Sequence, residues 1–131
     1  MRTASFAAAA VALLAIAPAA SAHHSGAMFD RNKERVITGT VKEFNWTNPH
    51  ASFAVDVVDA SGQTSVWDVE MNSPNNLVHD GWKRSTIKPG DKVSVAIYPL
   101  RDGRPGGTYV GIALPDGKHL GTMGEAGASA R

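Results

Sequence analysis

The chain has 131 residues, with 13 basic and 12 acidic side chains, which is enough for one domain and too short for two ordinary ones. It contains no cysteine, so a small protein held together by disulfides is excluded. Its near-neutral charge gives no general electrostatic attraction to nucleic acid or to an anionic membrane, and we expect no partner of either kind.

The first 22 residues have the pattern of a secretory signal peptide. Arg2 precedes an apolar run over residues 6–17, and Ala20-Ser21-Ala22 forms a small-residue cleavage site. The apolar run is shorter than the roughly 20 residues that a membrane-spanning helix needs, which disfavours a membrane anchor. We therefore predict cleavage after Ala22 and a soluble, periplasmic or secreted product. Only Arg2 is lost, so 12 basic and 12 acidic residues remain.

The predicted mature chain begins with a polar N-terminal arm over residues 23–34, which shows no clear period. A strand rich in β-branched residues follows over residues 36–46. Its apolar phase slips between Val41 and Phe44, which predicts a bulge or bend. Gly39 would allow another backbone segment to approach closely.

Two further strands come before a helix. Apolar residues alternate over residues 51–57 and again over residues 67–71, as expected for half-buried strands. The carboxylates between them are predicted to face solvent: Asp56, Asp68 and Glu70. Ser73-Pro74 is typical of a helix N-cap followed by proline at the first helical position, and Gly81 is placed to end that helix.

Two strands complete the predicted domain. Residues 93–97 alternate as a fourth strand, and a loop rich in glycine and proline over residues 101–107 leads to a fifth strand bearing Val110, Ile112 and Leu114.

The order of these elements predicts the fold class. Three strands, a short helix and two strands are the order of an all-β, five-stranded barrel of the oligonucleotide/oligosaccharide-binding (OB) type, with the helix between strands three and four. We predict this OB-like barrel over residues 35–120, and a disordered tail over residues 121–131. An open β-sandwich is the main alternative.

Three of the five histidines could form a metal site. Cleavage after Ala22 would leave His23 with a free α-amine beside its imidazole, and these two nitrogens can close a chelate ring on one ion. A further imidazole from His24 or His50 would complete a nitrogen-rich, planar set that suits Cu(II). His50 follows Pro49, which restricts the backbone just before the second strand.

The histidines also have ordinary interpretations. The pair at residues 23–24 could simply be polar residues that the signal peptidase tolerates, and His50 could bond to backbone near Asn48. We expect His79, on the helix, and His119, near the tail, to have no role in the site.

The alternative function is a barrel that binds a glycan, peptide or protein partner, in which the histidines are incidental. It predicts that Trp46 or Trp82 is exposed in a groove, where an aromatic ring could stack on a ligand. Catalysis is disfavoured because so small a domain offers little surface to hold a polymeric substrate. The chain also has no nucleophile elbow, phosphate loop or HExxH motif.

Several short motifs are spread along the predicted mature chain. They are His23-His24-Ser25, Trp46-Thr47-Asn48-Pro49-His50, Ser73-Pro74-Asn75, Gly81-Trp82, Lys88-Pro89-Gly90-Asp91 and Leu114-Pro115-Asp116-Gly117. Together they resemble domain-of-unknown-function family 6152, whose members are small exported bacterial proteins. The resemblance covers about residues 23–119 and implies a signal peptide, a compact β-domain and no assigned activity. Two of the shared motifs carry His23, His24 and His50, which favours the metal hypothesis.

Overall fold

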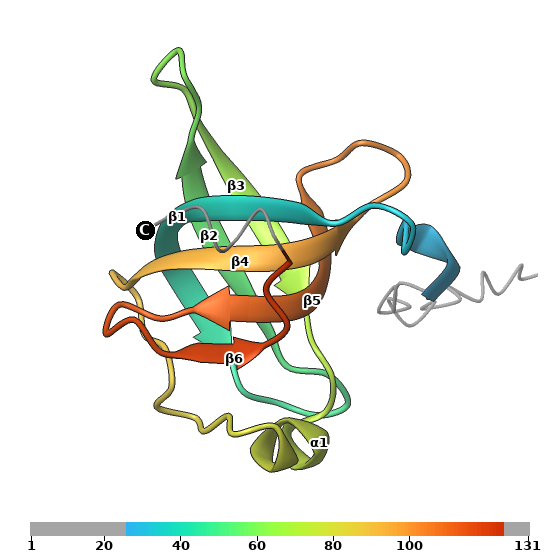
Figure 1. Cartoon of the computed structure of the whole chain (residues 1–131), viewed down its shortest axis with the longest axis vertical. Coiled ribbons are helices and arrows are strands. Elements are labelled where there is room, and N and C mark those ends of the chain that lie inside the picture. The colour runs from blue at the N-terminus through green and yellow to red at the C-terminus, as the bar shows by residue number, and fades with distance from the viewer. Residues whose placement is uncertain (1–25, 125–131) are drawn as a thin grey trace, which may run out of the picture.

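In the computed structural model, which describes residues 26–124, a curved sheet closes into a barrel with a short helix at one end (Figure 1). The hairpin between the second and third strands projects from the opposite end. The predicted signal peptide, His23 and His24 lie outside the described residues, as do residues 125–131. No helix within residues 26–124 is long and apolar enough to cross a membrane.

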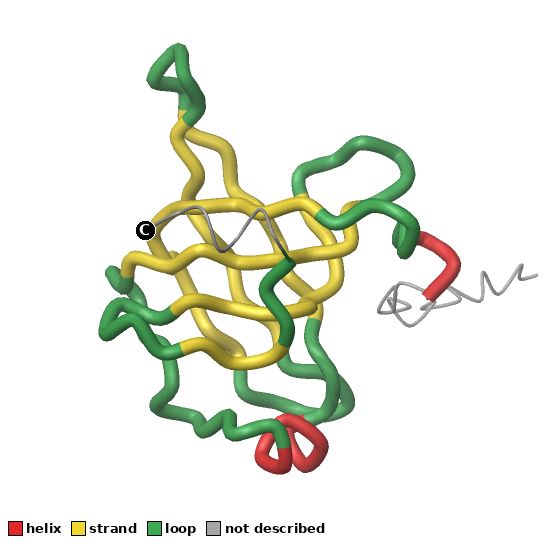
Figure 2. Tube along the Cα trace, in the orientation of Figure 1, coloured by secondary structure: helices red, strands yellow, loops and turns green. Residues whose placement is uncertain are grey.

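The described part of the chain forms two short helices and six strands, with loops mostly at the two ends of the barrel (Figure 2). Their bounds are η1 Gly26–Met28, β1 Arg35–Asn45, β2 Ser52–Val58, β3 Thr64–Glu70, α1 Pro74–His79, β4 Lys92–Pro99, β5 Gly106–Ala113 and β6 His119–Gly121.

The strand pairing closes the barrel. β1 pairs antiparallel with both β2 and β4, and the outer partners of these strands are β3 and β5. β3 and β5 then pair in parallel, through residues 68–70 and 106–108. Five strands in this order, with α1 between β3 and β4, form an OB-type barrel. The predicted fold class is confirmed, and the open β-sandwich is wrong.

β1 bends where its apolar phase slips. The register of β1 against β2 shifts between Val41 and Glu43, which confirms the predicted bulge. A Cβ atom on Gly39 would overlap the carbonyl oxygen of Asp56 in β2. Glycine at this position therefore allows β1 to cross close to β2, as the sequence indicated.

Helix α1 is fixed at both ends by local sequence. Ser73 caps its N-terminus and Pro74 occupies the first turn, as predicted. Past its C-terminus, Gly81 has a φ of 91° and the backbone N–H of Trp82 donates to the carbonyl oxygen of Leu77 over 2.9 Å. This Schellman-type ending turns the chain back, so that Trp82 and Leu77 both lie in the core.

The apolar core is built from alternate residues of the strands and closed by the helix end. Its fully buried members include Phe53, Val69, Val95 and Trp82. Sequence alternation predicted most of this face, but the assignment of Val110 to it is wrong. The β4–β5 register shifts between Ala96 and Ile97, leaving Val110 as the extra residue of a bulge and Tyr109 against the core.

Two segments that flank the barrel contact it. Phe29 lies within the expected polar arm, yet it is only 4% exposed and bridges to Leu100. At the other end, β6 pairs with β5 through residues 119–121, and the N–H of Thr122 donates to the carbonyl oxygen of Val110. The sequence analysis predicted neither contact.

Candidate metal site

A cleft of about 730 Å³ lies where the N-terminal segment, the end of β3, helix α1 and β5 meet. It is lined by Gly26, Phe29, Arg31, His50, Glu70, Met71, Asn72, Leu77, Asp80, Thr108, Tyr109, Val110 and Gly121. His50 and Gly26 both line this cleft. Gly26 is three residues after His23, the predicted mature N-terminus.

His50 is held at the end of the β2–β3 ladder. Its neighbour Ala51 exchanges backbone hydrogen bonds with Met71 and Asn72, and the Asn48–Pro49 bond before it is cis. The Nδ1 atom of His50 lies 2.9 Å from the carbonyl oxygen of Met71. A carbonyl oxygen only accepts, so Nδ1 is the donor in this contact, and the Met71 carbonyl orients the imidazole ring.

This hydrogen bond is the type that orients metal-ligating histidines. Such a histidine donates one ring N–H to a carbonyl or carboxylate, which fixes the tautomer and directs the other nitrogen to the ion. The ordinary interpretation of His50 was a bond to backbone near Asn48. The structure shows Nδ1 of His50 in contact with the carbonyl of Met71, the residue that follows β3, and the His50 side chain is exposed.

The other histidines are not gathered at the cleft. His79 ends α1 and His119 begins β6, and both are exposed, as expected. Among residues 26–124, no three His, Cys, Asp or Glu side chains form a group that could hold a metal ion. His50 is thus the one predicted ligand that the structure describes.

Two carboxylates also line the cleft, and the sequence analysis missed both. Glu70 lies at the end of β3, where the predicted outer face meets the cleft, and Asp80 follows α1. Their position beside the Met71 backbone depends on how α1 folds back under the barrel, which strand alternation alone does not show.

Beneath the cleft, Trp82 and Tyr109 form a hydrogen-bonded aromatic pair. The indole Nε1–H of Trp82 donates to the Tyr109 hydroxyl over 3.2 Å, and the two rings meet edge to face with centroids 5.4 Å apart. Burial raises the pKa of Tyr109, the hydrogen bond from Trp82 opposes this rise and the Asp80 carboxylate adds to it; together they bring the pKa from 10.0 to about 12.

This raised pKa predicts an alkaline loss of stability. The unfolded chain releases the Tyr109 proton near pH 10, whereas the folded chain keeps it to about pH 12. The contribution to the free energy of unfolding is therefore complete below pH 10 and is lost between pH 10 and 12. Urea unfolding across this range should show a steeper decline for the native protein than for Tyr109→Phe. If the free energy of unfolding declines equally in the two proteins, the raised pKa of Tyr109 is contradicted.

The tryptophans offer little surface for stacking. Trp82 is fully buried, so its predicted exposure in a groove is wrong. Trp67 is 8% exposed, with the Arg35 guanidinium 4.5 Å above its ring. Trp46 is half-buried and packs edge to face on Phe44.

Comparisons with known proteins identify the family of the chain and one solved structure to which it is similar. A family model described as "Family of unknown function (DUF6152)" matches residues 9–109. No curated protein matches the chain. Among solved structures, the chain is similar to Rim1, a mitochondrial single-stranded DNA binding protein from S. cerevisiae. The identity is 14%, the match covers 63% of this chain and 92% of Rim1, and the TM-score is 0.48.

Proposed function

Because the chain belongs to the DUF6152 family, a family of unknown function, we propose its function from its own residues: it is an exported protein that binds Cu(II) through its mature N-terminal histidine. One observation carries the proposal. The contact of 2.9 Å between Nδ1 of His50 and the Met71 carbonyl is of the kind that orients a metal-ligating imidazole, and His50 lines a cleft that Gly26 also lines.

The proposed donor set is the α-amine and imidazole of His23 together with Nε2 of His50, with His24 as a further candidate. In the proposal, the three residues from His23 to Gly26 supply up to about 10 Å of chain between the amine and the cleft. The three nitrogens suit the tetragonal geometry of Cu(II). The α-amine, with a pKa of about 7.7–8.0, can lose its proton to a metal near neutral pH.

The charge around His50 also favours a cation. Glu70 and Asp80 line the same cleft, where opposite charges attract an ion before its ligands close around it. Arg31 opposes this attraction, so the carboxylates alone would not make a strong site. They would support a site whose ligands are nitrogens, and the role that fits is copper carriage or buffering outside the cytoplasm.

The test is a Cu(II) titration of protein that begins at His23, compared with the same protein acetylated at its α-amine. Acetylation converts the amine to an amide, which no longer offers its nitrogen lone pair to the ion, and so removes the chelate ring. The native form is expected to bind at least about a hundredfold more tightly, because its second bond is intramolecular. Its paramagnetic resonance spectrum should show nitrogen-rich coordination. Equal affinities for the two forms would refute the proposed function.

The alternative, a barrel that binds a glycan, peptide or protein partner, has less support. It requires Trp46 or Trp82 to be exposed in a groove, but Trp82 is fully buried and Trp46 is half-buried. A nucleic-acid partner is disfavoured because three carboxylates and one guanidinium line a second cleft, and an excess of carboxylates repels phosphates. They are Glu43, Asp68, Glu70 and Arg104.

A further inference from the structure

Strand β3 is paired along only part of one edge. β2 pairs with its other edge over the whole length, residues 64–70, whereas β5 pairs with this edge through residues 68–70. Within residues 26–124, no strand pairs with the rest of this edge, residues 64–67, which we call the open edge of β3. The β2–β3 hairpin and the β4–β5 loop extend in different directions, which leaves the open edge between them (Figure 1).

The hydrogen bonds around β3 show which backbone groups face the open edge. Gln63, just before β3, accepts a backbone hydrogen bond across the hairpin from Asp59. Backbone groups alternate in direction along an antiparallel pair, so the odd-numbered residues of β3 face β2 and the even-numbered residues face away. The carbonyl oxygen of Asp68 agrees with this alternation, because it points toward β5. The N–H and C=O groups of Thr64 and Val66 therefore face the open edge.

The open edge lacks the features that usually protect a strand from further pairing. Residues 64–67 include neither proline nor lysine, and the register between β2 and β3 contains no bulge. Val66 is 38% exposed, and Val58 on the paired strand is 61% exposed. Such an edge can accept an extended segment as an added strand, whose backbone hydrogen bonds give affinity and whose alternate side chains give specificity.

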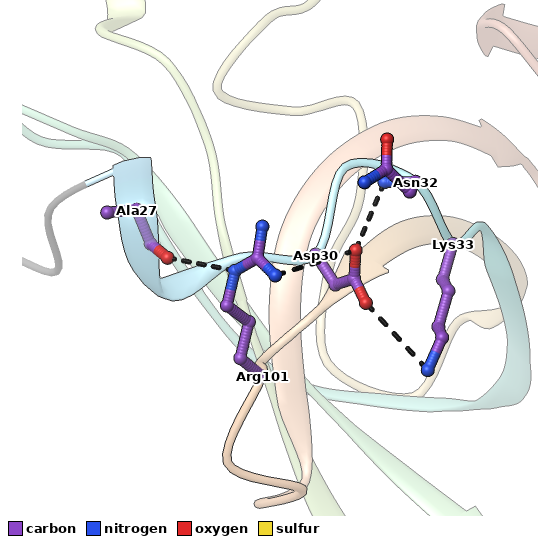
Figure 3. Close-up of polar contacts among 5 residues, drawn as sticks. All are labelled: Ala27, Asp30, Asn32, Lys33 and Arg101. Atoms are coloured by element: carbon purple, nitrogen blue, oxygen red, sulfur yellow. Dashed lines mark hydrogen bonds and ion pairs between the residues drawn. The ribbon is translucent and has the colours of Figure 1, made fainter.

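The β4–β5 loop is fixed on the N-terminal segment, away from the open edge (Figure 3). Its base is closed by a hydrogen bond of 3.0 Å from the N–H of Leu100 to the carbonyl oxygen of Gly106. Arg101 donates from Nε to the carbonyl oxygen of Ala27 over 3.1 Å, and its guanidinium lies 3.9 Å from the Asp30 carboxylate. These contacts keep the loop from folding down onto β3, so the open edge stays accessible.

The charge beside the open edge selects a basic partner. The second cleft, of about 480 Å³, is lined by Asp68 and Glu70 from β3 and by Glu43 from β1. Among the described residues that line it, Arg104 is the one cation, and its guanidinium already bonds to Asp102 over 2.7 Å. Alternate side chains of a strand project to one face, so basic residues at every second position would all face these carboxylates. A second copy of this chain would instead bring like charges together.

We propose that the open edge of β3, together with the second cleft, docks an extended basic segment of a partner protein by strand addition. The docking uses backbone pairing and charge, so it needs no exposed tryptophan. It is also independent of copper binding. Because the charges at this site are exposed to solvent, added salt weakens the attraction.

The first test measures binding of a labelled, end-capped peptide of three Lys-Val repeats by fluorescence anisotropy. One control peptide has glutamate in place of lysine, and another is methylated at every backbone nitrogen, which removes its hydrogen-bond donors. The Lys-Val peptide is expected to bind at least about tenfold more tightly than either control, because both charge and backbone pairing contribute. Equal binding of the methylated peptide would refute strand addition, and equal binding of the glutamate peptide would refute the charge preference.

Two variants of the protein locate the binding to the open edge. Val66→Pro removes an N–H that faces the open edge and no bond to β2, so it is expected to preserve the fold and weaken binding at least about tenfold. Asp68→Lys reverses a charge of the cleft and should shift the preference toward the glutamate peptide. Asp116→Lys is its matched control, since Asp116 is an exposed carboxylate outside the cleft. Circular dichroism checks folding, and native binding by Asp68→Lys would overturn the proposal.

Hydrogen exchange tests the pairing residue by residue. Bound Lys-Val peptide should slow exchange at the Thr64 and Val66 amides, and it should change Ser65 and Trp67 little, because these already face β2. Slowing that spares Thr64 and Val66 would place the peptide elsewhere and refute the proposal. Sedimentation of the protein alone tests the other occupant. A dimer that Val66→Pro dissociates would mean that a second copy, and not a basic segment, occupies the open edge.

Discussion

Replacing His50 by alanine in the mature protein is expected to weaken Cu(II) binding by more than about a hundredfold. Loss of a group that only orients a metal ligand costs about 10- to 100-fold in affinity, and His50 is proposed to be a ligand itself. Its Nδ1 lies 2.9 Å from the Met71 carbonyl oxygen, so Nε2 is the nitrogen that the proposal assigns to the ion. Competition with a chelator of known affinity measures the change.

The controls for His50→Ala are His79→Ala and His119→Ala. Both control residues are exposed histidines outside the cleft, so they remove an imidazole without changing the proposed site. We expect each control to keep the native affinity. Unchanged affinity in His50→Ala would remove His50 from the donor set, and a loss at either control would place the copper elsewhere. Thermal unfolding checks that all three variants remain folded.

The largest expected effect on stability follows from replacing Trp82 by alanine. Trp82 is fully buried and its ring packs on Phe44, Phe53 and Tyr109, with centroids 5.9, 6.3 and 5.4 Å away. Truncating a buried tryptophan costs about 3–5 kcal/mol, a large part of the roughly 5–15 kcal/mol that stabilises a domain. The substitution also leaves the Tyr109 hydroxyl without its indole donor. Urea unfolding followed by circular dichroism measures the loss.

Trp46→Ala is the matched control for Trp82→Ala. Trp46 is half-buried at the edge of the same aromatic cluster, so its removal opens no enclosed cavity. It should cost less than half as much free energy as Trp82→Ala. Equal losses would mean that the Schellman-type turn after α1 does not place Trp82 in the core as described.

The parts of the fold that were predicted correctly depend on neighbouring residues. The phase slip after Val41 indicated the β1 bulge, and Ser73-Pro74 with Gly81 indicated both ends of α1. Each signal acts within a few residues, because side-chain alternation and helix capping are local rules. The order of these elements was then enough to indicate an OB-like barrel.

The missed features depend on contacts between distant segments. Val110 looked inward by alternation, but a bulge on β5 against β4 moved Tyr109 to the core face. Phe29 is one apolar residue in a polar stretch, which shows no period, and its partner Leu100 is 71 positions away in the sequence. Long-range pairing of this kind leaves no pattern within either segment.

At the candidate site, the sequence identified His50 as a possible ligand but not the hydrogen bond that orients its ring. His50 stood out by its type and by the proline before it. The carbonyl that its Nδ1 contacts belongs to Met71, the residue after β3, which the pairing of β2 with β3 brings alongside. Export, cleavage after Ala22 and copper binding remain predictions, since His23 and His24 lie outside the described residues.

The contact between Phe29 and Leu100 links two segments that lie 71 positions apart in the sequence. Arg101 reinforces it by donating to the carbonyl oxygen of Ala27 over 3.1 Å. A change of sequence in the β4–β5 loop therefore alters the surroundings of the segment that precedes β1, so the two segments are expected to vary together.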